Sequence, residues 1–88
     1  MTAKTKELSN RPIVKRFEID AKYVIFHIGA ESSEFTHEYW FNLDQCNTHE
    51  KLTKWLLHLS EKNWFSIEAA RSLIMGVCRQ CDLEMYDM

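Results

Sequence analysis

Three stretches in the first half of the chain alternate between apolar and polar residues with a period of two, which is typical of β-strands. They run from Ile13 to Ile19, from Tyr23 to Ile28 and from Phe35 to Leu43, with short polar segments at 20–22 and 29–34 between them. Connections this short join neighbouring strands that run in opposite directions, so the pattern predicts an antiparallel β-meander.

The second half of the chain changes to the period of an amphipathic α-helix. The first apolar stripe has the spacing i, i+3, i+4, i+7 and consists of Leu52, Trp55, Leu56 and Leu59. The second stripe steps by alternating threes and fours and consists of Ile67, Ala70, Ile74, Val77 and Cys81. Two helices joined by so short a connection should fold back on each other as an antiparallel hairpin.

Capping residues indicate where these helices begin. Asn47 can cap the first helix while Glu50 reaches back, as in a capping box, and Ser66 can cap the second. The predicted order is βββαα, an α+β domain over residues 12–88 whose helix hairpin packs on one face of the sheet. Residues 1–11 are polar and basic without periodicity, which predicts a disordered basic arm.

The two faces of the predicted sheet differ in composition. The helices should cover the more apolar face, which consists of Phe17, Ile19, Val24, Phe26, Ile28, Phe35, Tyr39, Phe41 and Leu43. The opposite face consists of Val14, Arg16, Glu18, Tyr23, Ile25, His27, Glu38 and Trp40. On this assignment His37 would be a hydrogen-bonded core residue, whereas His27 and His58 would be exposed.

The second face is unusually aromatic and apolar for a solvated surface, which is typical of a contact surface. We therefore predict a partner-binding site made of Tyr23, Ile25, His27 and Trp40 with Arg16 beside them. A strand register shifted by one residue would exchange the two faces and bury Trp40 instead.

Four cysteine and histidine residues have the spacing of zinc ligands. Cys46 and His49 form one pair, Cys78 and Cys81 form another, and a helix hairpin would bring the two pairs to the same end. The alternative, which we favour, is that they are ordinary core and surface residues and that the protein needs no cofactor. A redox role for the second pair is disfavoured, because the C-terminal end of a helix opposes a thiolate.

Composition excludes several classes of protein. The net charge is −2, with the basic excess in residues 1–22 and an acidic excess after them, which argues against a general nucleic-acid binder. The three cysteines and the polar start MTAKTKELSN predict a cytoplasmic protein, and no apolar run is long enough to span a membrane. Because no nucleophile elbow, HExxH sequence or glycine-rich phosphate loop is present, we expect that the protein is not an enzyme.

The run EYWFNLDQCNTHEKLTKWLLHLSEKNWF, following a short β-meander, resembles small proteins encoded by bacteriophages and prophages, including host-defence inhibitors of the anti-CRISPR type. Such proteins are compact α+β domains that occlude a surface of their partner. The resemblance implies a non-enzymatic inhibitor that binds a host protein or protein complex. It covers residues 13–85 in architecture and carries over no individual functional residue.

Two functions are therefore open from the sequence. The first is a protein-interaction module, with homodimerisation through the same face as an allied possibility. The second is a nucleic-acid-binding module in which Tyr23 and Trp40 stack on bases while Arg16 and Lys22 contact phosphates.

Overall fold

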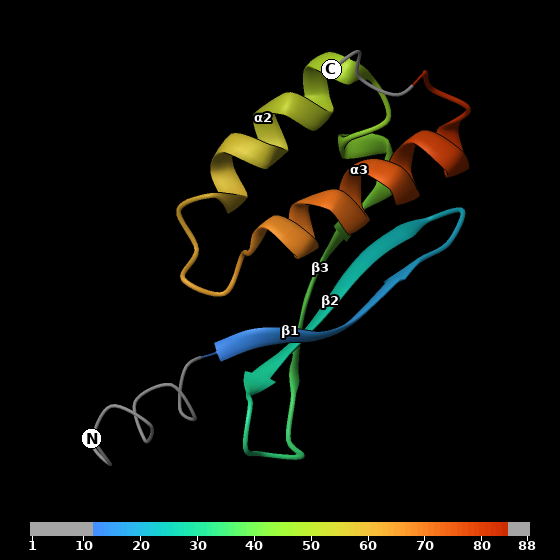
Figure 1. Cartoon of the computed structure of the whole chain (residues 1–88). Helices are drawn as coiled ribbons and strands as arrows, with labels where there is room; N and C mark the ends of the chain where they lie inside the picture. The colour runs from blue at the N-terminus through green and yellow to red at the C-terminus, as the bar shows by residue number, and fades with distance from the viewer. Residues whose placement is uncertain (1–11, 85–88) are drawn as a thin grey trace.

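A computed structural model describes residues 12–84 and contains a sheet followed by two helices. The elements are β1 (Pro12–Ile19), β2 (Tyr23–Ala30), β3 (His37–Asn42), the short 3₁₀ helix η1 (Leu43–Gln45), α2 (His49–Leu59) and α3 (Ile67–Cys81). The strands pair antiparallel in the order β1-β2-β3, and both helices lie on one side of the sheet (Figure 1). The predicted βββαα class is confirmed, whereas the arm predicted at 1–11 lies outside the described residues.

The core lies between the sheet and the helix pair. Val24, Phe26 and Ile28 alternate along β2, are fully buried and point toward the helices, as the period of two predicts. The other buried apolar residues of the same cluster are Phe41, Leu43, Cys46, Leu52, Leu59, Trp64, Ala69, Leu73 and Val77. Leu52 and Leu59 belong to the predicted stripe of α2, with Trp55 and Leu56 partly buried beside them.

The helix caps agree with the sequence at one helix and differ at the other. The Ser66 hydroxyl accepts a hydrogen bond from the Ala69 amide at 3.1 Å, so the predicted cap of α3 is confirmed. The cap of α2 is Thr48 and not Asn47, because the Thr48 hydroxyl accepts the bond from the Lys51 amide. The helix therefore begins one residue later than the predicted capping box.

The buried stripe of α3 is displaced from the predicted one. Its buried residues are Ala69, Leu73, Val77 and Cys78, whereas Ile67 is 77% exposed. Gly76 also lies where α3 contacts β1, and its lack of a side chain leaves room for that strand. A Cβ at this position would lie 3.1 Å from the Phe17 ring and 3.3 Å from Ile19. A hydrophobicity pattern gives no weight to glycine, so it does not find this close approach.

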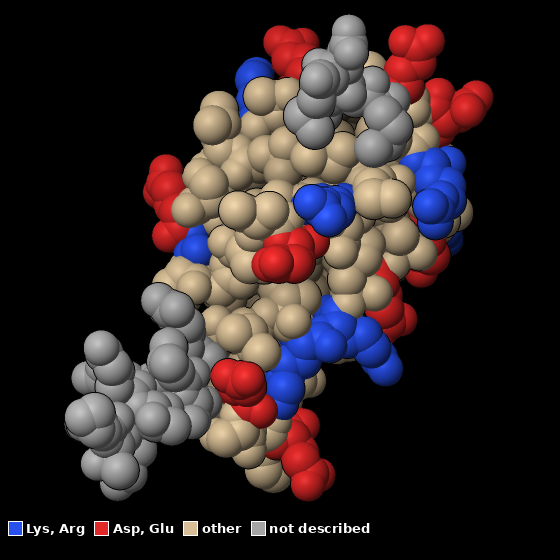
Figure 2. Space-filling model, in the orientation of Figure 1, with Lys and Arg blue, Asp and Glu red and all other residues tan. Residues whose placement is uncertain are grey.

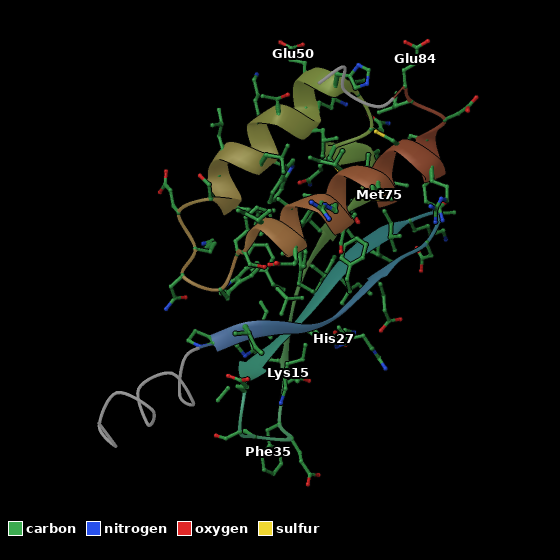
Figure 3. The ribbon with its side chains drawn as sticks, viewed as in Figure 1. Lys15, His27, Phe35, Glu50, Met75 and Glu84 are labelled. Carbon is green, nitrogen blue, oxygen red and sulfur yellow. The ribbon has the colours of Figure 1, made fainter. Side chains whose placement is uncertain are left out.

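The predicted faces of the sheet also need three corrections near the ends of strands. The β1–β2 register shifts between Val14 and Arg16, which is a β-bulge, and Val14 consequently packs against the core and not on the opposite face. β3 begins at His37, so Phe35 lies in the connecting loop, 85% exposed, at the end of the sheet remote from the helices (Figure 3). His37 is exposed as well, so its predicted core position is wrong.

Candidate functional site on the outer sheet face

The strand register gathers the predicted partner-binding residues on one surface. Ile25 pairs with Trp40 on β3, and His27 pairs with Arg16 on β1. Because Val24, Phe26 and Ile28 point toward the helices, Tyr23, Ile25 and His27 point away from them. We call this surface, with Arg16, Glu18, Tyr23, Ile25, His27, Glu38 and Trp40, the outer face. Trp40 is 57% exposed, so the alternative register that would bury it is excluded.

One half of the outer face is aromatic. The rings of Tyr23 and Trp40 lie 5.4 Å apart between centroids and meet at 88°, an edge-to-face arrangement that aromatic pairs prefer. They border a shallow depression of about 190 Å³ that Ile25 and Glu38 also line. Sequence reasoning placed Glu38 on this face but not in the site, although its position two residues before Trp40 could have indicated it.

The other half of the outer face is a charged cluster around His27. The Nε2 atom of His27 donates to Glu18 Oε2 at 2.6 Å, and the Arg16 guanidinium donates to the same oxygen at 2.7 Å. The Nδ1 atom of His27 faces Glu38 Oε2 at 3.9 Å. His27 is only 9% exposed, so its predicted exposure is wrong. Long side chains on both neighbouring strands flank the imidazole and shield it from water.

Glu18 accepts hydrogen bonds from His27 and Arg16, and these bonds hold the pKa of its carboxyl below the ordinary value of 4.5. The bond from His27 has the larger effect and the bond from Arg16 the next largest. A group with a lowered pKa in the folded state contributes stability above its unfolded pKa and loses it as the pH falls through the folded pKa. We expect Glu18→Gln to remove this part of the acid sensitivity, so that stability falls less steeply below pH 4.5 than in the unmodified chain.

Urea unfolding at neutral pH and at a series of pH values below 4.5 measures this difference. Glu61→Gln, which changes an exposed carboxylate remote from the cluster, is the matched control. Parallel stability curves for the Glu18 variant and the unmodified chain would contradict the role of this carboxylate.

The topology predicted for the cysteine and histidine quartet is confirmed, but the four side chains do not form a metal centre. His49 at the start of α2 donates from Nε2 to the Glu84 carbonyl at 2.6 Å, so it lies beside the segment that follows α3. In residues 12–84, however, no three Cys, His, Asp or Glu side chains are arranged to hold a metal ion. Burial raises the pKa of the Cys46 thiol to about 12, so it remains a neutral, small apolar side chain at neutral pH.

A larger depression adjoins the aromatic half of the outer face. It has a volume of about 440 Å³ and shares Tyr23 with that face. Its other lining residues are Ala21, Lys22, Asn42, Leu43, Asp44, Asn47 and Cys81. The side chains that could contact a partner therefore extend beyond the predicted protein-binding set toward Lys22, which the sequence had indicated only as a phosphate contact, and toward Asn42, which it had not indicated.

Figure 2 shows basic and acidic side chains interspersed on the visible face of the molecule, where neither sign forms a broad patch. Neither helix of residues 12–84 combines the length and the apolar composition of a membrane span. Comparison of the chain with protein-family models, with curated proteins and with solved structures found no match.

Proposed function

We propose that this protein is a non-enzymatic protein-binding module that uses the outer face to bind and occlude a surface of its partner, in the manner of a phage-encoded inhibitor of a host complex. The observation that supports this most is Trp40, a large side chain that remains 57% exposed beside Tyr23. Tryptophan and tyrosine are the residues most often found as binding hot spots. Exposed aromatic pairs of this kind are typical of contact surfaces.

The charged cluster fits the same use of the outer face. Glu18, Arg16 and His27 are already bonded to one another, so little side-chain entropy is lost when a partner covers them. They lie beside the aromatic pair, as polar residues at the rim of an interface lie beside its anchors. The three free cysteines, Cys46, Cys78 and Cys81, favour the reducing cytoplasm as the place of action.

Nucleic-acid binding by the outer face is less favoured. Arg16 is neutralised by Glu18, and the carboxylates of Glu18 and Glu38 lie on the same surface that a phosphate backbone would have to approach. If nucleic acid were nevertheless the partner, affinity would fall steeply with salt, by roughly 0.7 log units per log unit of salt for each phosphate neutralised on a single strand.

Trp40→Ala tests the proposed function. We expect the variant to keep its thermal melt but to bind the partner at least about 30-fold more weakly, the loss typical of a hot spot. The partner is first recovered from a host lysate with the tagged full chain, and its affinity is then measured by calorimetry. Sedimentation shows whether that partner is a second copy of the chain.

Leu57→Ala is the matched control, because Leu57 is 66% exposed but lies on α2 and not on the outer face. It should bind as the unmodified chain does. Equal affinities for the Trp40 variant and the unmodified chain, or equal losses in both variants, would refute the outer face as the binding surface.

A further inference from the structure

The depression beside Trp40 has the chemistry of a cation site. We propose, as a refinement that rests on the proposed function, that it receives one lysine side chain of the partner protein. Its ammonium group would lie against the rings of Trp40 and Tyr23 and pair with the Glu38 carboxylate.

Two aromatic rings form the walls of this site. Trp40 and Tyr23 meet at 88° with their centroids 5.4 Å apart, so they make a corner that presents aromatic surface on two sides. The faces of aromatic rings carry a negative potential, and tryptophan attracts cations most strongly of the aromatic side chains. The side chain of a lysine can make two favourable contacts with such rings. Its methylene chain packs on their apolar surface, and its ammonium group is attracted to their faces.

The third side of the site is the carboxylate of Glu38. Glu18 already accepts bonds from two donors at 2.6 and 2.7 Å, whereas Glu38 approaches His27 only to 3.9 Å, beyond hydrogen-bond distance. The Glu38 side chain is also half exposed, at 57%. Of the two carboxylates on the outer face, Glu38 is therefore the one that can accept from an incoming ammonium group.

The size of the depression limits what it can hold. The depression is shallow and has a volume of about 190 Å³. Sites for drug-sized ligands measure roughly 300–1,000 Å³, so this one suits a single side chain. Ile25, directly opposite Trp40 in the register, gives the depression an apolar lining against which the methylene groups of a lysine would pack.

Two cations of residues 12–84 already have partners away from this site. Lys62 lies over the ring of Tyr39, 5.5 Å from its centroid, and Arg16 is bonded to Glu18. In residues 12–84, no lysine or arginine lies over Trp40 or Tyr23. The aromatic corner is thus available to a cation from a partner.

A pair of short glycine peptides tests the site, one with a central lysine and the other with norleucine, which has a similar chain but no charge. Each is titrated into the isotopically labelled full chain while the indole N–H resonance of Trp40, assigned with Trp40→Phe, is followed. We expect the lysine peptide to bind roughly two- to fivefold more tightly, the ratio that corresponds to an exposed cation–π contact. Equal binding of the two peptides, or no shift with either, would overturn the proposal.

Glu38→Gln identifies the carboxylate. The variant should lose about two- to threefold in affinity for the lysine peptide, in keeping with an exposed ion pair, and should leave norleucine binding unchanged. Glu61→Gln is the matched control and should change neither. A Glu38 variant that binds lysine as tightly as the unmodified chain would refute the assigned pairing.

The peptide titration and the partner assay can fail independently. Loss of partner binding in Trp40→Ala without any preference for lysine would leave the proposed function intact and refute the cation site. A clear preference for the lysine peptide together with normal partner binding by Trp40→Ala would refute the proposed function. In that case the site would bind a cation, but not a lysine of that partner.

Discussion

Replacing Phe26 by alanine should lower the free energy of unfolding by about 3–5 kcal/mol, the range measured for deleting a buried phenylalanine. Phe26 is fully buried at the centre of the sheet, and its ring contacts those of Phe17, Trp64 and Phe65 at centroid distances of 5.2, 5.4 and 6.0 Å. These neighbours come from β1 and from the connection between the helices, so a cavity at Phe26 weakens the contact between the two layers. Whole domains are stable by about 5–15 kcal/mol.

Phe35→Ala is the matched control, because it deletes the same side chain from a position that is 85% exposed. We expect it to change stability by less than about 0.5 kcal/mol. Urea unfolding monitored by circular dichroism measures both variants. A Phe26 variant that unfolds at the same urea concentration as the Phe35 variant would show that the two layers do not pack around Phe26.

Gly29→Ala should also destabilise the protein, by about 1–3 kcal/mol or more. A Cβ at Gly29 would collide with the backbone oxygen of Phe35, which lies in the connection between β2 and β3. A backbone atom cannot turn aside as the end of a side chain can. The β2–β3 connection would therefore have to move to admit one methyl group.

Gly76→Ala separates this effect from the general cost of adding a methyl group. The nearest atoms to its Cβ would be side-chain atoms of Phe17 and Ile19, at 3.1 Å or more, and alanine favours the helix over glycine by about 1 kcal/mol. The two contributions oppose each other, so thermal unfolding should show a smaller loss than for Gly29→Ala. A larger loss at Gly76 would contradict the explanation by backbone collision.

The alternation of residues predicted the sheet well because β2 has a helix layer on one side only. Val24, Phe26 and Ile28 had to be buried together, and this fixed the direction of Tyr23 and Ile25 as well. The exposure of Trp40 followed from the same register. These predictions succeeded because each depends only on the alternation of apolar and polar residues within one strand, which can be read directly from the sequence.

The incorrect predictions depend on contacts between elements. Ile67 has the right spacing for the buried stripe of α3, but it stands in the first turn and is 77% exposed. Phe35 continues the alternation of β3 into a loop. His27 appears exposed from its face of the sheet, and only the three-dimensional register reveals that residues from β1 and β3 close around it.

The bulge in β1 has a consequence for how copies of the protein can meet. β1 borders the described sheet, and an extended strand in that position presents unpaired amide and carbonyl groups to which another strand could add. The irregular pairing between Val14 and Arg16 interrupts that row, and Lys15, between them, directs its ammonium group to the carbonyls of Ala30 and Ser33. An edge strand with a bulge and a lysine is a poor template for a second sheet, so the addition of a strand from another copy is disfavoured at the β1 edge.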